Sequence, residues 1–259
     1  MPPLSATIIT LNEERNIERC LASLQGIVDE IVVVDSLSTD RTKEICTRYG
    51  VVFVEQPFLG HIEQKNFAIE RATHAQILSL DADEALSPEL ARSILSAKEQ
   101  GFPAEGYSMN RLNWYCDAFI RHGNWYPDRK IRLIQKGKGW FGGLNPHDKI
   151  IMESGTRVAQ LEGDLLHYTY HTIEEHVIQG NKFSTISARS LREKGRRAGW
   201  HNLFLNPTMA FLQHYVIKAG FLDGFNGLVI AHQQAYQTFL KYAKLMQLQR
   251  HARDEGAKP

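Results

Sequence analysis

The sequence predicts an α/β fold, in which a mainly parallel sheet with flanking helices is followed by a helical C-terminal extension. Strand-like and helix-like runs alternate through the first hundred residues, which is typical of a doubly wound sheet. The run 30–34 is apolar after its first residue, as expected for a parallel strand buried on both faces. After residue 172 the pattern becomes helical. We therefore divide the chain into an α/β domain, residues 1–170, and an extension, residues 171–259.

The elements of the first domain follow in order. Strands are expected at residues 6–10, 30–34, 51–54 and 76–80, and helices at residues 12–24, 38–49, 62–72 and from 87 onward. Asp40 lies within a good helix-start sequence, and Pro88 occupies a first-turn position of the last helix. The carboxyl ends of the strands then share one edge of the sheet, where such folds bind ligands.

The second half has a weaker pattern. Residues 107–111 and 130–134 resemble strands in a region of mixed strands and long loops. The helical extension runs to about residue 249, and we expect interruptions near Pro207 and at Gly220, Gly224 and Gly227. These breakers predict several helices rather than one.

Composition narrows the class of protein. A net charge of +1 gives no bulk attraction to nucleic acid, and we expect no nucleic-acid partner. The three cysteines are far apart and form no CxxC pair, which favours free thiols in a reducing compartment. No signal-like or membrane-spanning run is visible, and we expect a cytoplasmic protein.

Acidic residues follow two of the predicted strands. Asp81 and Asp83 come directly after the run 76–80, so both carboxylates emerge at the ligand-binding edge. Mg²⁺ or Mn²⁺ takes such oxygen ligands together with substrate phosphates. A solvated acidic turn is the alternative for this pair taken alone. Asp35 ends the second strand, where it can accept hydrogen bonds from a nucleobase or ribose, or cap the next helix.

Three segments together resemble the nucleotide-side motifs of family 2 glycosyltransferases, which have the GT-A fold, a Rossmann-like α/β architecture. They are residues 8–14, 32–40 and 80–84, and their order and spacing match across residues 5–90. Later segments resemble the branch that contains the lipopolysaccharide-core glucosyltransferases acting on heptose. These are residues 64–66, 132–134, 147–148, 167–170 and 220–224.

The resemblance implies roles for individual residues. Thr10, Leu11 and Glu13 would line the nucleotide pocket, and Asp35 would contact uracil. Asp81 and Asp83 would hold the diphosphate of a UDP-sugar donor through a divalent metal, with Asp83 as the direct ligand. Lys65 would add positive charge near the phosphates, although a solvated helix lysine is an equal alternative.

An inverting transfer needs a general base that deprotonates the acceptor hydroxyl. The family branch has a His-Glu pair where this chain has His147 and Asp148. We predict Asp148 as the base and His147 as a neighbouring positioning or metal-side group. Glu153 and Asp164 are lesser candidates. The acceptor implied by the branch is a lipopolysaccharide-core or lipid-linked saccharide, and the donor sugar is a hexose, with glucose favoured.

Three further groups of residues can each be interpreted in two ways, as structural or as functional. The rings of Trp114, Trp125, Tyr126 and Trp140 suit a protein core or an acceptor cleft. The basic residues of the run 189–197 precede Trp200, Leu203, Phe204 and Leu205, which suits either an anionic membrane surface on the cytoplasmic side or a solvated helix face. His167 and His171 suit a metal or phosphate cluster, but we favour a structural role.

The sequence argues against three other functions for an α/β protein of this kind. A sugar nucleotidyltransferase normally has a glycine-rich basic loop after the first strand, whereas residues 11–14 are acidic and contain no glycine. An oxidoreductase would need a GxGxxG segment there. A non-catalytic binding module conflicts with the intact aspartate pair. The chain contains no Gln-x-x-Arg-Trp motif of processive synthases, so we expect transfer of single sugars.

Overall fold

The computed structural model describes residues 1–144 and 147–256, and it leaves the side chains of 144, 147 and 252–256 undescribed. The chain forms two compact units. Unit 1 comprises Met1–Leu112 and Asp128–Tyr168, and unit 2 comprises Asn113–Pro127 and Thr169–Pro259. Residues 113–127 thus group with the C-terminal helices. The domain boundary expected at residue 170 stays a prediction.

The N-terminal half of the sheet is parallel, as predicted. Its strands lie in the order β3-β2-β1-β4, so the first strand of the chain is central. The apolar runs make this possible, because β1, β2 and β4 are covered on both faces and Val32, Val33 and Leu78 are fully buried. Their bounds are β1 Leu4–Thr10, β2 Glu30–Asp35, β3 Val52–Glu55 and β4 Gln76–Asp81.

The other half of the sheet has antiparallel pairs, and sequence analysis missed most of it. It continues the order as β8-β6-β11-β5, with the short β7 beside β6. A separate hairpin is formed by β9 and β10. The bounds are β5 Glu84–Leu86, β6 Gly106–Tyr115, β7 Ala118–Ile120, β8 Asp128–Gln135, β9 Gly139–Leu144, β10 His147–Met152 and β11 Val158–Tyr170.

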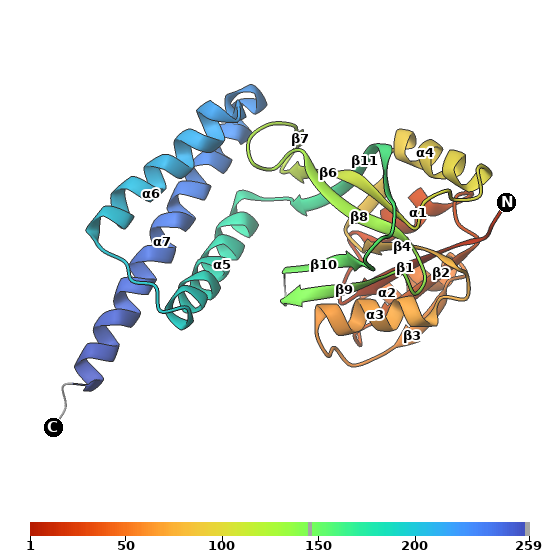
Figure 1. Ribbon diagram of the computed structural model, residues 1–259, viewed down its shortest axis with the longest axis horizontal. Helices are drawn as coiled ribbons and strands as arrows, with labels where there is room; N and C mark the ends of the chain where they lie inside the picture. The colour runs from red at the N-terminus through yellow and green to blue at the C-terminus, as the bar shows by residue number, and fades with distance from the viewer. Residues whose placement is uncertain (145–146, 257–259) are drawn as a thin grey trace. The chain divides into compact units, whose positions relative to one another are not determined.

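Helices cover both faces of the sheet in unit 1 (Figure 1). One core contains buried side chains of α1 Ile17–Leu24, α2 Thr42–Arg48 and α4 Pro88–Glu99 against the sheet. A second core packs α3 His61–Arg71 and the β9–β10 hairpin against the opposite face. Ser87 caps α4 by accepting a hydrogen bond from the amide of Leu90, with Pro88 in the first turn. The predicted fold class is therefore confirmed.

Unit 2 consists mainly of helices that pack along a long C-terminal helix, which contacts both α5 and α6. The elements are α5 Ile173–Glu193, α6 Trp200–Leu212, a π-helical turn Gln213–Ile217, a 3₁₀ turn Gly220–Asp223 and α7 Gly224–Gly256. A capping box between Thr172 and Glu175 starts α5. None of the helices in the described part of the chain is long and apolar enough to cross a bilayer.

Two predicted interruptions are absent. Pro207 lies inside α6, and Gly227 lies inside α7. At Gly227 the glycine serves packing, because a Cβ there would collide with the backbone carbonyl of Gly220. Local sequence showed the breaker residue but not the nearby turn that requires it.

Candidate active site

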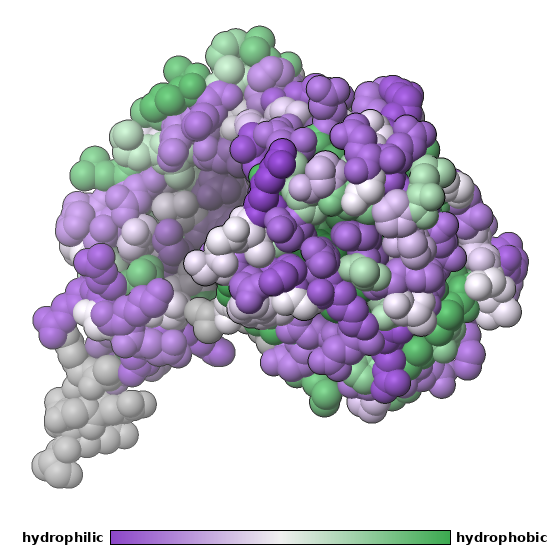
Figure 2. Space-filling view, turned by 45° about the vertical axis from the view of Figure 1, so that its right-hand side comes forward, coloured by the Kyte–Doolittle hydropathy of each residue, from purple (hydrophilic) through white to green (hydrophobic). Residues whose placement is uncertain are grey.

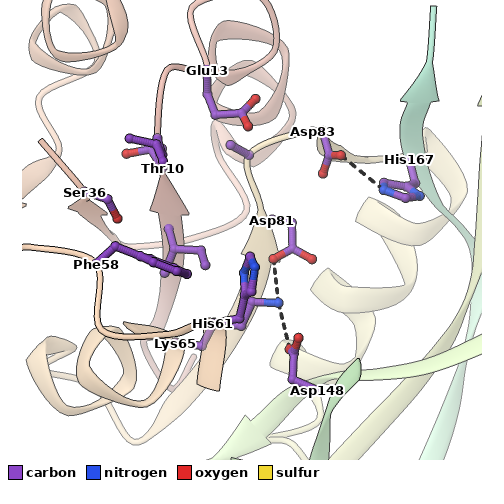
Figure 3. A pocket seen from close by; sticks show the side chains of 13 residues that line it. Thr10, Glu13, Ser36, Phe58, His61, Lys65, Asp81, Asp83, Asp148 and His167 are labelled. Atoms are coloured by element: carbon purple, nitrogen blue, oxygen red, sulfur yellow. Dashed lines mark hydrogen bonds and ion pairs between the residues drawn. The ribbon is translucent and has the colours of Figure 1, made fainter. Parts of the chain in front are cut away.

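A cavity of about 400 Å³ lies at the carboxyl ends of β1 and β4 (Figure 3). The two strands are neighbours in register, and Ile9 pairs with Asp81. The segments that follow them therefore leave the sheet side by side. The cavity is lined by Ile9, Thr10, Leu11, Glu13, Ser36, Phe58, His61, Lys65, Asp81, Ala82, Asp83, Asp148 and His167.

The loops after β1 and β2 are tied together and form one wall of the cavity. Asn12 has a left-handed backbone with φ of 56°, and its side-chain oxygen accepts a hydrogen bond from the amide of Thr39 at 2.9 Å. In the other direction, the amide of Glu13 donates to Oγ1 of Thr42 at 2.8 Å. Burial raises the pKa of Glu13, and the nearby charge of Asp83 adds to this effect. The wall therefore places a carboxyl group that gains a proton more readily than usual.

Asp35 supports this wall from behind. It is only 1% exposed and is not among the lining residues. Its carboxylate accepts hydrogen bonds from Oγ1 of Thr10 at 2.7 Å and from the amide of Ser38 at 2.7 Å. Direct contact between Asp35 and a nucleobase stays a prediction. In this structure the carboxylate orients Thr10 and the second loop.

Lys65 connects two carboxylates across the floor of the cavity (Figure 3). Its Nζ lies 2.8 Å from Oδ1 of Asp81 and 2.9 Å from Oδ2 of Asp148. The lysine projects from α3, and Asp148 belongs to β10. Burial alone would lower the pKa of Lys65, but the charges of Asp81 and Asp148 raise it above the ordinary value. The ammonium group is therefore charged at neutral pH and holds Asp148 in place.

Asp81 is held on its other side by a buried arginine. Its Oδ2 lies 2.8 Å from Nη2 of Arg132 in β8, and the same nitrogen lies 2.6 Å from Oε1 of Glu84. Burial alone would raise the pKa of Asp81, but the charges of Lys65 and Arg132 hold it well below its usual range. Both carboxylate oxygens of Asp81 are thus engaged by cations of the chain, and its role as a metal ligand stays a prediction.

Asp83 faces a histidine from a distant strand (Figure 3). Its Oδ2 lies 3.2 Å from Nε2 of His167 in β11. The pairing of β11 with β5 places His167 opposite Glu84, and the amide of Tyr168 donates to the carbonyl of Asp83 at 2.9 Å. The sequence favours a structural role for His167, whereas the fold places it in the cavity beside Asp83.

This pair fits a divalent cation that also binds a phosphate ligand. Within the described residues, no group of three or more His, Cys, Asp or Glu side chains is arranged to hold a metal ion. The carboxylate of Asp83 suits Mn²⁺ or Mg²⁺ when most remaining ligands are phosphate oxygens and water, and the imidazole of His167 lies close enough to add one nitrogen ligand. Asp83 and His167 would be the protein ligands of such an ion.

Seven of the nine site residues predicted from sequence line this one cavity: Thr10, Leu11, Glu13, Lys65, Asp81, Asp83 and Asp148. Asp35 lies behind it, and the side chain of His147 lies outside the described residues. Phe58 and His61 were missed. His61 is the first residue of α3 and Phe58 lies in the segment before it; their ring centroids are 5.1 Å apart, and Phe58 is 47% exposed. Apolar residues 58–59 before a glycine were the available signal.

The aromatic residues that the sequence suggests for an acceptor cleft belong to different units of the chain. Trp125 packs in a core of unit 2 with Tyr115 and Tyr170, and Trp114 packs edge-on against Phe119. Trp140 is 47% exposed on β9 in unit 1. An acceptor role for these rings stays a prediction.

Fold and cavity together describe an α/β protein in which acidic and basic groups face one pocket at the carboxyl ends of parallel strands. The sequence matches glycosyl transferase family 2 over residues 5–149, and the chain belongs to this family.

Relatives match along nearly the whole chain. It is 33% identical to the lipopolysaccharide core biosynthesis glycosyltransferase LpsC of Rhizobium meliloti, with 96% of this chain and 93% of that protein covered. It is 31% identical to an uncharacterized glycosyltransferase of Rickettsia typhi, covering 96% and 88% of the two chains. The mannosyltransferase PcManGT of Pyrobaculum calidifontis, solved with GDP-Man and Mn²⁺, has a TM-score of 0.56 at 16% identity, covering 95% and 87%. That likeness supports the GT-A fold.

Proposed function

We propose that this glycosyltransferase moves a hexose, with glucose favoured, from a UDP-sugar to a lipopolysaccharide-core or lipid-linked saccharide, with inversion at the anomeric carbon. The supporting observation is one cavity with two different ends. Asp83 faces His167 at one end, where the two would hold a divalent cation, and Lys65 positions the carboxylate of Asp148 at the other. The likeness to LpsC, named for lipopolysaccharide core biosynthesis, supports the acceptor class.

The reaction is a single displacement. The acceptor hydroxyl gives its proton to Asp148 as its oxygen bonds to the anomeric carbon, while the bond from that carbon to the diphosphate oxygen breaks and UDP leaves. Lys65 donates to Oδ2 of Asp148 and holds this carboxylate in place before the reaction. A divalent cation at Asp83 and His167 would neutralise charge on the leaving diphosphate.

Calorimetry of UDP binding with and without Mn²⁺ tests the donor side. We expect binding that depends on Mn²⁺, and we expect His167→Ala and Asp83→Asn each to weaken it by roughly 10-fold or more, since each removes one metal ligand. Lys138→Ala, on an exposed strand turn, is a control of unchanged binding. Tight GDP binding in place of UDP would correct the nucleotide, and no binding of either would reject the donor site.

We also propose that unit 2 binds the surface of an anionic membrane, on the cytoplasmic face, which would bring the enzyme to a lipid-linked acceptor. Large apolar side chains are exposed at helical spacing on α6 and the turn that follows it: Trp200, Phe204, Leu205, Met209, Leu212 and Val216. Green, apolar side chains are visible along the rim of this unit in Figure 2. No acidic residue occurs between Glu193 and Asp223, whereas Lys194, Arg196, Arg197 and Lys218 do.

Co-sedimentation with lipid vesicles tests the membrane proposal. Phosphatidylglycerol vesicles should retain the protein more strongly than phosphatidylcholine vesicles. Phe204→Gln should weaken retention by about 10-fold, because it removes one large apolar side chain that would insert into the lipid. Val158→Gln replaces an apolar side chain that is 41% exposed in unit 1 and serves as the control. Equal retention of Phe204→Gln and the wild type would reject this surface.

A further inference from the structure

A second cavity in unit 1 lies beside the first. It has a volume of about 520 Å³ and shares Lys65, Asp81 and Asp148 with the donor cavity. The rest of its wall comes from β6, β8 and β10. The proposed base therefore stands where the two cavities meet.

The second cavity is rich in cations. Its basic wall residues are Lys65, Arg111, Arg129, Lys130, Arg132 and Lys149. The donor cavity, by contrast, contains one lysine and four carboxylates. The two neighbouring spaces therefore differ in the charge of ligand that they favour.

Part of this positive charge is balanced within the protein. Lys65 and Arg132 pair with Asp81, Asp148 and Glu84. Two cations share one carboxylate, since Arg111 and Lys130 lie 2.7 and 3.0 Å from opposite oxygens of Asp128.

The remaining charge is available to a ligand. Arg129 and Lys149 are exposed and have no ion-pair partner within the described part of the chain. Their guanidinium and ammonium groups are the donors that bind phosphate and carboxylate most strongly. The cavity is therefore complementary to an anion rather than to a neutral sugar alone.

Position and charge together assign a ligand class. A nucleophilic hydroxyl must reach Asp148 from a side that the donor does not fill. We propose that the second cavity binds the acceptor saccharide through an anionic group, a phosphate monoester or a sugar carboxylate, next to the hydroxyl that is glycosylated. This inference rests on the proposed function, and it adds Arg129 and Lys149 as residues that select the acceptor.

Ligand-observed NMR with the full chain, saturated with UDP and Mn²⁺, tests this assignment. The probes share one ring and differ in charge: methyl glucoside, glucuronic acid and glucose 6-phosphate. We expect one or both charged probes to bind at least about 10-fold more tightly than methyl glucoside, and the stronger of the two identifies the anion. Arg129→Ala and Lys149→Ala should each remove most of this preference. Arg92→Ala and Lys138→Ala, exposed cations outside the cavity, should keep it.

The outcomes separate the two proposals. If UDP does not bind, the proposed function fails. If UDP binds and the three probes bind equally, or if the Arg129 and Lys149 variants keep the preference, the anionic acceptor cavity is rejected. Charged probes that bind only when UDP is absent would occupy the donor phosphate position, which also rejects it.

Discussion

Replacing Arg132, a buried residue of β8 beside the cavity, with methionine should strongly lower the free energy of unfolding of the protein. The guanidinium is buried and contacts Glu84 at 2.6 Å and Asp81 at 2.8 Å. Methionine fills similar space without charge. Glu84 is fully buried, so the change removes its nearest cation and leaves a buried carboxylate with only Arg111, at 3.7 Å, to balance its charge.

The size of the effect follows from the contacts that remain. Removing one partner of a buried pair costs about 3–5 kcal/mol. Here Glu84 keeps the amide of Asp81 at 3.0 Å and Arg111 at 3.7 Å, and Asp81 keeps Lys65. We therefore expect the lower end, about 3 kcal/mol in the free energy of unfolding. For a chain of this size that corresponds to a fall in Tm of roughly 6–12 °C.

Urea unfolding at pH 7 measures this loss, with Arg92→Met as the matched control. Arg92 is 70% exposed and paired to Glu89, so its replacement should change stability by less than about 0.5 kcal/mol. Combining Arg132→Met with Glu84→Gln should recover part of the loss, with a coupling energy of about 1–3 kcal/mol, because the orphaned charge is removed. The reasoning would be refuted if Arg132→Met lowered the free energy of unfolding by less than about 1 kcal/mol, or if the losses of the two single variants added up to that of the double variant.

Three other predictions concern catalysis, pH and packing. Asp148→Asn should keep UDP affinity and lower the transfer rate by roughly 10²-fold or more, since it removes the proposed base; a normal transfer rate would exclude that role. The stability that Asp81 contributes should be present at pH 7 and 5 and decline below about pH 4. The pKa of Asp81 is lowered in the folded state, so below about pH 4 the unfolded chain takes up a proton at this residue while the folded protein does not, which favours unfolding. The free energies of unfolding of the wild type and Asp81→Asn at pH 7, 5 and 3.5 measure this decline. A difference between the two proteins that stays the same at all three pH values would contradict it. Gly227→Ala should cost about 1–3 kcal/mol through its clash with Gly220, whereas Gly26→Ala, with open space around it, reports strain alone.

The parallel half of the fold could be predicted because each of its strands is an apolar run followed by a helix. The same reasoning located the cavity. Thr10 and Asp81 end neighbouring parallel strands, and the carboxyl ends of such strands meet at one edge. Residues placed at these ends by short-range pattern were therefore brought together, whereas the role of Lys65 was indicated only by the family resemblance.

The antiparallel half was harder because its partners are far apart in the sequence. His167 reaches Asp83 only through the pairing of β11 with β5, and Arg132 reaches Asp81 from β8. A strand pattern shows which residues alternate but not which distant strand pairs with it. Both residues lay in segments that resembled the family, yet the chemistry of a single histidine or arginine did not reveal its carboxylate partner.

Asp81, the last residue of β4, and Asp83, just beyond the strand, have different surroundings. Asp81 is saturated by Lys65 and Arg132, so its charge organises the floor shared by both cavities. Asp83 lies two residues later, beyond the strand, and faces His167. An ion at Asp83 could take His167 as a second ligand, whereas an ion at Asp81 would have to displace Lys65 and Arg132. We infer that the first aspartate maintains the geometry between donor and base, while the second provides the position for the metal.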